Sequence, residues 1–537
     1  MSADKLILGD IITMEPGHPR AEALTVKDGR IQFAGSEETA RALCGEATEV
    51  LDYRGSFVYP GIVEGHCHPD MAGSRIKWQA DLTAGESMPE YVEMMAGFIA
   101  QNPGLGEYRG AGWCERECKP TAAMLDAICP DVPVVLQSVD GHSMWFNTPG
   151  MAKYGIDAAA AEYWGTDIIR LGEDGSPTGY ISEGPVNKIT MSASYTDDQR
   201  DAAYLAWQDF AFEHGLTACL HAGITESTCR IYERLEKSGK LKIRTYGVFM
   251  VDEHVEDYVD QVRVAKELAE RYNSEHFKVV GIKIFMDGVV EAHTAWMCEG
   301  YEDDPDNTGV KRMCDFDRVS DLYAAAGEAG MFVHAHTIGD GAVKFAVDCI
   351  EAAEKRTGNF SARHALCHLQ VVRPEDVRRM ADLRISPVVA PLWVPVHPLY
   401  YPQAVEWIGA QRAAAMYPIK SFVDCGAPVT FHTDYPVSTD MDVPRSVYCA
   451  VLRTTPEFGE AGVHLPSERI SREQSLAALT SEAAYSMWQE DEIGMIAPGY
   501  VANLTVFDSD FLLDDIERVG ASKLVATIVD GEVVYSA

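Results

Sequence analysis

The stretch 59–70, YPGIVEGHCHPD, places two histidines one residue apart at the end of a short apolar run. Successive side chains of a β-strand alternate between its faces, so His66 and His68 would point to one side and Cys67 to the other. Two imidazoles in that arrangement can bind one metal ion. Two structural histidines would give the same pattern, so a metal site requires further ligands from elsewhere in the chain.

Such ligands stand at the ends of later apolar runs: Lys283 in VVGIKIFM, His336 in MFVHAHTIGD, His368 in ALCHLQ and Asp434 in TFHTD. Runs of this kind alternate with helical stretches, which predicts parallel strands joined by helices. After 57–68, the predicted strands are 215–223, 242–250, 278–288, 330–340, 362–370, 384–391 and 427–434. Eight strands predict an α/β fold, the (β/α)8 TIM barrel, whose chemistry lies where the carboxyl ends of the strands meet. We therefore expect the ligands to gather there.

Lys283 differs from the other candidates because its run is apolar enough to bury it. A buried ammonium group is costly unless it is paired or neutralised. A neutral lysine can react with carbon dioxide, and the resulting carbamate can bridge two cations. Alternatively, Lys283 pairs with Asp287 or another carboxylate. The spacing alone does not decide between these interpretations.

Composition indicates a globular protein that acts on a small molecule. The chain has 537 residues, 47% of them hydrophobic and 24% charged, and no apolar stretch approaches the ~18 residues of a membrane span. The net charge of -37 disfavours nucleic acid and anionic membranes as partners. We expect a cytoplasmic protein with reduced cysteines, since the N-terminus has no secretory pattern. A homodimer is compatible with the sequence.

The two chain ends share a pattern of short alternating strands, which predicts one small β domain from residues 1–58 and 488–537. Asp28-Gly29 is expected just off a hairpin tip, and Asp530-Gly531 in a turn. Residues 59–487 would form the barrel domain. The long gap after its first strand, about residues 75–210, is predicted to be an insertion over the barrel mouth.

The chain resembles the amidohydrolase superfamily, in particular the amidohydrolase 3 branch that includes N-substituted formamide deformylases. The resemblance spans nearly the whole chain and rests on PGIVEGHCH, VDGHSMWFN, GIKIFMDG, HTIGDGAV, CHLQ, HTDYPV and IGMIAPGYVANLTVFD. It implies a binuclear centre with carboxylated Lys283 as the bridging ligand. The implied ligands are His66, His68 and Asp434 for one metal, and His336 and His368 for the other. The sequence departs from the branch in HTIGDGAV and CHLQ, where HAIGDRA and EHAQ are more usual, and an extra histidine, His334, stands beside an expected ligand.

The resemblance also implies that the insertion reaches the substrate pocket. His142 would stabilise an oxyanion or hold the substrate, or it would simply pack against Trp145. Aromatic residues could line an apolar pocket or serve only for packing. These candidates are Trp113, Trp145, Trp296, Trp393 and Tyr400. Asp287 and Asp340 are expected to support the ligands rather than to bind metal.

The expected chemistry is hydrolysis of a carbon–nitrogen bond other than a peptide bond. Imidazole and carboxylate ligands suit one or two Zn²⁺ ions, although other divalent transition metals are allowed, and zinc lowers the pKa of bound water to about 7. The metal-bound hydroxide would attack a small amide, such as an N-formyl amine, an N-acyl amine or a lactam, while Asp434 transfers the proton to the leaving nitrogen. The alternatives are a metal-dependent deaminase of a heterocycle and a non-catalytic scaffold, although no expected ligand is missing.

Overall fold

A computed structural model describes residues 2–114, 119–138, 143–166, 168–182, 189, 195–359, 361–398, 400–438 and 441–537. The chain divides into two compact units. The first combines residues 1–69 with 208–537, and the second is formed by residues 70–207. Among the described residues, no helix is both long and apolar enough to cross a membrane.

The first unit contains an eight-stranded parallel sheet, and each of the eight predicted strand regions contributes one strand to it. In spatial order its members are β18 (Thr430–Phe431), β17 (Ser386–Val389), β16 (Ala365–His368), β15 (Phe332–Thr337), β14 (Phe277–Phe285), β13 (Arg244–Met250), β12 (Leu216–Ile224) and β5 (Ile62–Cys67). Apart from the crossover between β5 and β12, the strands follow one another in sequence order. The predicted (β/α)8 barrel is confirmed.

The barrel closes where its first strand, β5, meets its last, β18. Gly65 is required at this seam, because a Cβ atom there would lie 2.4 Å from Thr430 Cγ2 and 2.5 Å from the Phe431 carbonyl oxygen. Beyond the short β18, the amide of Asp434 donates to the carbonyl of His66 at 3.0 Å. The amide of His68 donates to the carbonyl of Tyr435 at 2.9 Å. Main-chain hydrogen bonds thus join the end of the first barrel strand to the segment that follows the last one.

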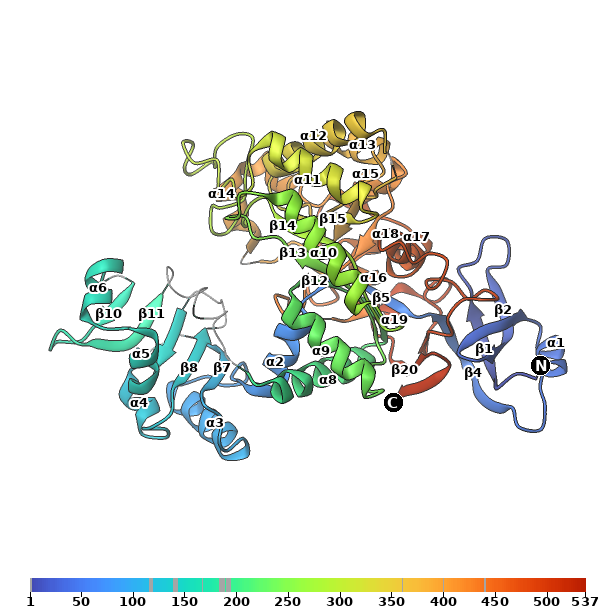
Figure 1. Ribbon diagram of the computed structural model, residues 1–537, viewed down its shortest axis with the longest axis horizontal. Helices are drawn as coiled ribbons and strands as arrows, with labels where there is room; N and C mark the ends of the chain where they lie inside the picture. Colours follow the sequence, from blue (N-terminus) through green and yellow to red (C-terminus); the bar gives the residue numbers. More distant parts are fainter. Residues whose placement is uncertain are drawn as a thin grey trace. The chain divides into compact units, whose positions relative to one another are not determined.

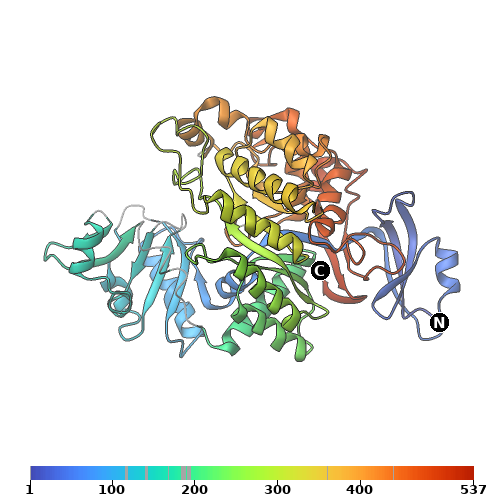
Figure 2. The same ribbon diagram turned by 45° about the horizontal axis from the view of Figure 1, so that its top comes forward.

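Helices connect the barrel strands, and several of them pack against the barrel sheet. They are α8 (Asp197–Glu213), α9 (Glu226–Lys237), α10 (Tyr258–Tyr272), α11 (Phe316–Glu328), α12 (Asp340–Thr357), α13 (Pro374–Asp382), α14 (Tyr400–Ala414), α15 (Ile419–Asp424), α16 (Val443–Leu452), α17 (Arg472–Leu479) and α18 (Ser481–Ser486). Helices α11 and α12 pack against each other and against β15 (Figures 1 and 2). Their amphipathic patterns explain this placement, since the buried residues of α11 recur at helical spacing.

A seven-stranded sheet unites the two ends of the chain, as predicted. Its order is β21 (Glu532–Ser536), β20 (Leu524–Val529), β19 (Leu504–Phe507), β4 (Glu49–Pro60), β1 (Lys5–Ile12), β2 (Arg20–Lys27) and β3 (Arg30–Gly35). Figure 1 shows the strands from both ends close together. The expectation for Asp28-Gly29 was wrong: this pair is the two-residue tip between β2 and β3, with φ of 51° and 72°. These positive φ values suit a tight hairpin turn.

The second unit, in the predicted insertion, has its own sheet and core. Its strands, in spatial order, are β10 (Ile169–Leu171), β11 (Pro177–Ser182), β9 (Ser143–Phe146), β8 (Val134–Ser138), β7 (Tyr108–Trp113) and β6 (Gln79–Asp81). The helices of this unit that lie before residue 197 are α2 (Pro69–Trp78), α3 (Met88–Gln101), α4 (Ala122–Asp126), α5 (Thr148–Tyr154) and α6 (Ala158–Trp164). Apolar residues of β7, β8, β9 and α3 form one of its buried clusters. The insertion is therefore a folded body rather than a long loop.

An ion-pair network links the barrel to the sheet formed by the chain ends. His276, just before β14, lies between Asp530 and Glu236, with nitrogen–oxygen distances of 2.8 Å and 3.1 Å. Arg244 also contacts Asp530 at 2.6 Å and approaches Glu275 at 3.6 Å. Burial alone would lower the pKa of His276, but its contacts with the Asp530 and Glu236 carboxylates outweigh burial and raise it. The network therefore favours a protonated His276 in the folded protein.

We expect His276→Gln to lower the melting temperature more at pH 6 than at pH 9. A histidine whose pKa is raised by folding stabilises the protein fully below the unfolded value of about 6.5, and this stabilisation is lost as pH rises through the folded pKa. The expected loss at low pH is about 1–3 kcal/mol. Differential scanning fluorimetry in the presence of a chelator would measure it. His254→Gln is the control, because the His254 side chain is 87% exposed; equal effects of His276→Gln at both pH values would contradict the prediction.

Candidate metal centre

The barrel seam brings three predicted ligands together. The Nε2 atoms of His66 and His68 lie 3.3 Å and 3.2 Å from the same carboxylate oxygen, Asp434 Oδ1. These side chains form a group whose potential ligand atoms all lie within 4.8 Å of one another. The side chain of His66 is fully buried, whereas that of His68 is 21% exposed. Imidazole and carboxylate donors arranged in this way can hold a divalent transition ion.

The electrostatic environment keeps the Asp434 carboxylate ionised. Burial would raise the pKa of Asp434, but contact with His68 and the nearby His368 and His432 together lower it well below its usual range. Burial is also the main reason that the pKa of His66 falls well below its ordinary value. A neutral imidazole and an ionised carboxylate are the protonation states in which these side chains bind metals.

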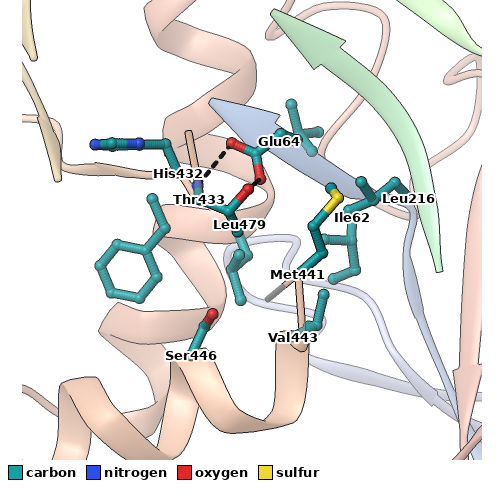
Figure 3. Close-up of a pocket in the computed structure, with 11 residues that line it drawn as sticks. Ile62, Glu64, Leu216, His432, Thr433, Met441, Val443, Ser446 and Leu479 are labelled. Carbon is teal, nitrogen blue, oxygen red and sulfur yellow. Dashed lines mark hydrogen bonds between the residues drawn. The ribbon is translucent and has the colours of Figure 1, made fainter. Parts of the chain in front are cut away.

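Glu64 supports the seam from the adjacent part of β5, and the sequence analysis missed it. Its carboxylate accepts hydrogen bonds from the amide of His66 at 3.0 Å. It also accepts from the amide of Thr433 at 3.0 Å and from the Thr433 hydroxyl at 2.9 Å (Figure 3). Burial raises the pKa of Glu64 to about 8, although these donors oppose the shift. The adjacent cavity, lined in part by Glu64 and Thr433, has a volume of about 10 Å³. It has room for one water at most, and the hydrogen bonds of Glu64 join the two sides of the seam.

The two ligands predicted for a second metal lie near each other but are less closely assembled. The rings of His336 and His368 are 4.6 Å apart, and His368 Nδ1 is 4.0 Å from Asp434 Oδ2. His336 Nε2 instead lies 3.0 Å from the carbonyl oxygen of Gly288. Within the described part of the chain, His336 joins no group of three potential ligands within 4.8 Å.

Lys283 is buried in β14, as the sequence predicts. It is 1% exposed, and its Nζ has no hydrogen-bond partner among the described residues. Burial lowers the pKa of Lys283. Asp287, the alternative partner considered for Lys283, accepts instead from the amides of Trp296, Ile338 and Gly339 at 2.8–3.1 Å. Asp287 therefore fixes the loops that follow β14 and β15, and its expected role in supporting the ligands stays a prediction.

Three further side chains lie against the predicted ligands. His334 Nε2 is 2.7 Å from His66 Nδ1 and 2.8 Å from Cys367 Sγ. The ring of His432 lies 5.3 Å from that of His66 and 5.1 Å from that of His368. The sequence analysis noted His334 but not His432, which the spacing of FHTD could have revealed, because residues two apart share a strand face. Cys367 shows no such spacing, although CHLQ is one of the departures from the family pattern.

The buried polar atoms of this cluster fit a bound cation. Lys283 Nζ, His368 Nδ1 and both ring nitrogens of His432 lack hydrogen-bond partners among the described residues. Leaving such a group buried and unpaired costs about 1–3 kcal/mol. Two ligand-bearing residues also have positive φ: 75° at His368 and 60° at Asp434. Such conformations are uncommon outside glycine and are often found at functional sites.

Two tryptophans predicted to contact substrate lie in the barrel unit. Trp393 stacks on His368, with ring centroids 5.6 Å apart and an interplanar angle of 16°, and its Nε1 donates to Ser438 Oγ at 2.7 Å. Trp296 packs against Phe345, with ring centroids 5.0 Å apart. Trp393 is thus directly beside a predicted ligand, whereas Trp296 belongs to the loop held by Asp287.

The other predicted substrate contacts belong to the insertion. Trp113 and Trp145 are fully buried in the core of that unit, with ring centroids 6.0 Å apart. The sequence analysis considered such packing as the alternative to substrate contact. His142, the predicted oxyanion or substrate contact, lies outside the described residues. The roles of these residues stay predictions.

Comparisons with known proteins identify the family and agree with the fold. The sequence pattern of the Amidohydrolase family matches residues 49–535. The chain is 27% identical to Protein LONG AFTER FAR-RED 3 of Arabidopsis thaliana, covering 99% of this chain and 92% of the relative. It is 26% identical to an N-substituted formamide deformylase of Arthrobacter pascens, covering 99% and 98%.

A solved structure shares the fold over nearly the whole length. It is that of an uncharacterized metal-dependent hydrolase from Pyrococcus furiosus, with a TM-score of 0.77, 24% identity and coverage of 95% of this chain and 99% of the other. The match to the family pattern spans the barrel and most of the end sheet, and it includes every predicted ligand. The predicted resemblance is confirmed, and this chain belongs to the amidohydrolase family.

Proposed function

We propose that the protein is a metal-dependent hydrolase that cleaves a carbon–nitrogen bond of a small amide, namely an N-formyl amine, an N-acyl amine or a lactam. The observation that carries this proposal is the convergence of His66 and His68 on one oxygen of Asp434 at the barrel rim. The similarity to a formamide deformylase over nearly the full length supports the amide class.

His66, His68 and Asp434 would hold one divalent ion, preferably Zn²⁺. His336 and His368 would hold a second, with carboxylated Lys283 between them. Such ions would polarise the substrate carbonyl and lower the pKa of water to about 7, which supplies a nucleophile at neutral pH. Lys283 suits the bridging role because its amine is buried, and the lowered pKa favours the neutral form that reacts with carbon dioxide.

Asp434 would transfer the proton. It would accept a proton from the attacking water and return it to the leaving nitrogen, so that the products are an acid and an amine. Trp393 would contact the substrate, a role supported by its stacking on the predicted ligand His368. His142 would stabilise the developing oxyanion or hold the substrate, since the family resemblance implies that its segment reaches the pocket.

A deaminase of a heterocycle is the second candidate. It is favoured by the asymmetry of the ligands, because His66, His68 and Asp434 form a compact group whereas His336 turns toward the Gly288 carbonyl. A one-metal centre would suit that reaction. A screen of N-formyl amines, N-acyl amines, lactams and aminated heterocycles, with amine and ammonia measured separately, tests the two candidates. Ammonia release from heterocycles alone would contradict the amide proposal, and no turnover by the metal-loaded protein would favour a non-catalytic scaffold.

We predict that protein expressed with ample zinc contains one or two ions per chain, because the buried ligands would otherwise lack compensation. His66→Ala and His68→Ala should each lose at least half of the metal, as measured by elemental analysis. His254→Ala, which removes an exposed histidine, should leave the content unchanged. Parent protein with well under one ion per chain would refute the metal centre.

We predict that Lys283 becomes carboxylated when two ions are bound. Carbon NMR of the zinc protein in labelled bicarbonate should reveal a carbamate signal, which Lys283→Ala should lose together with part of the metal. Lys278→Ala is the matched control, because Lys278 lies in the same strand but donates to Gln489 at 3.0 Å. If Lys283→Ala retains the full metal content and hydrolytic rate, the bridge does not exist.

We predict that Asp434→Asn folds, keeps metal on the His336 and His368 side, and loses kcat far more than substrate affinity. Asparagine retains the shape and an oxygen, but it cannot accept and return a proton, and general acid–base catalysis typically contributes ~100- to 10,000-fold. Steady-state kinetics and metal analysis on the same preparation measure both effects. Turnover within a few-fold of the parent would mean that another group moves the proton.

A further inference from the structure

His66 uses its two ring nitrogens in different directions. Nε2 faces the Asp434 carboxylate at 3.3 Å, whereas Nδ1 lies 2.7 Å from His334 Nε2. His66 and His334 are both 1% exposed, so water does not provide a ready alternative partner for Nδ1. The nitrogen that would bind a metal is thus separated from the nitrogen that contacts the protein interior.

The partner nitrogen of His334 is shared. Cys367, in the neighbouring strand β16, places its Sγ 2.8 Å from the same His334 Nε2. The other ring nitrogen of His334, Nδ1, has no hydrogen-bond partner among the described residues. A neutral imidazole has one acceptor lone pair, so the His66 ring and the Cys367 thiol compete for one acceptor.

We propose that His334 and Cys367 are positioning residues that set the tautomer of His66, with His334 supporting metal binding and the Cys367 thiol opposing it. The inference rests on the proposed function, because it concerns His66 as a ligand of the metal. It assigns a role to two side chains that the predicted ligand set does not use.

The reasoning follows from where the protons must be. A cation bound through Nε2 requires the single proton of a neutral His66 ring to be on Nδ1, from which it can be donated to His334 Nε2. Metal-bound histidines usually donate this second N–H to a carboxylate, a carbonyl or water, and loss of the acceptor typically weakens metal binding 10- to 100-fold. Here the acceptor is an imidazole, which can equally donate in its other tautomer. His334 can therefore support His66 only in the tautomer in which its Nε2 carries no proton.

The thiol of Cys367 is the opposing influence. A thiol is a weak donor, and when it donates to His334 Nε2 it occupies the lone pair that the His66 N–H needs. Removing His334 and removing the thiol should consequently change metal affinity in opposite directions. A purely structural role would instead make both substitutions either neutral or harmful.

The test is a zinc titration against a competing chelator, using the full chain and its variants. His334→Leu should bind the His66-dependent zinc ion 10- to 100-fold more weakly. His334→Gln, which keeps an acceptor near the Nε2 position, should stay within a few-fold of the parent. Cys367→Ala should bind zinc more tightly than the parent, and unchanged or weaker binding in this variant would overturn the opposing role of the thiol. His364→Leu is the matched control, because His364 is also buried but accepts from the Val333 amide at 3.0 Å, and it should change stability without changing affinity.

Proton NMR provides a measurement that should not change if His334 has only a structural role. The zinc protein should show a slowly exchanging, downfield imidazole N–H signal that is lost in both His334→Leu and His66→Ala. Unchanged affinity and an unchanged signal in folded His334→Leu would overturn the inference while leaving the metal centre intact. A sulfur-to-cobalt charge-transfer band in the Co²⁺ protein, lost in Cys367→Ala, would make Cys367 a ligand and would also overturn it. Failure of the parent to bind zinc would refute the metal centre itself, and this inference with it.

Discussion

The site depends first on the closure of the barrel between its first and last strands. The amide of Asp434 is bonded to the carbonyl of His66, so the backbone bond that closes the barrel also sets the distance between two ligands. Gly65 permits the close approach of the strands, and Glu64 gathers donors from both sides of the seam. Because these contacts involve the main chain, the ligand geometry is a consequence of the fold rather than of flexible side chains alone. A defect in the seam should therefore disturb folding and metal binding together.

The second constraint is the cost of burying polar side chains without partners. Lys283 and His368 are almost completely removed from solvent, and each has an unpartnered nitrogen in the described part of the chain. Burial lowers the pKa of both side chains and so favours their neutral forms, in which each can act as a nucleophile or a ligand. Without a cation, the cluster therefore destabilises the protein, whereas its neutral nitrogens suit a bound cation. Such a conflict between stability and local chemistry is typical of functional sites.

Much of the fold could be predicted because apolar runs mark buried parallel strands, and because parallel strands place their carboxyl ends together. That rule alone brings His66 and Asp434 to one rim, although they are far apart in the sequence. It does not reveal which side chains support the seam, so Glu64 was missed. Nor does it reveal the positive φ of His368, which depends on the loop that follows the strand. The direction of the His336 ring was equally hidden, because a backbone carbonyl, that of Gly288, engages its Nε2.

The two halves of the predicted centre differ in how they are held, and this difference bears on the order of metal binding. His66, His68 and Asp434 are fixed by hydrogen bonds of the barrel seam. In contrast, His336 precedes a loop that is tied down through Asp287, and its Nε2 is already engaged by a carbonyl oxygen. This contact leaves Nδ1 as the nitrogen of His336 that could bind an ion, since a metal-bound histidine usually donates its other N–H to such an acceptor. A first ion would therefore bind to groups that the seam already holds together, whereas a second ion would depend on the less closely assembled His336 and His368 and on carboxylation of Lys283.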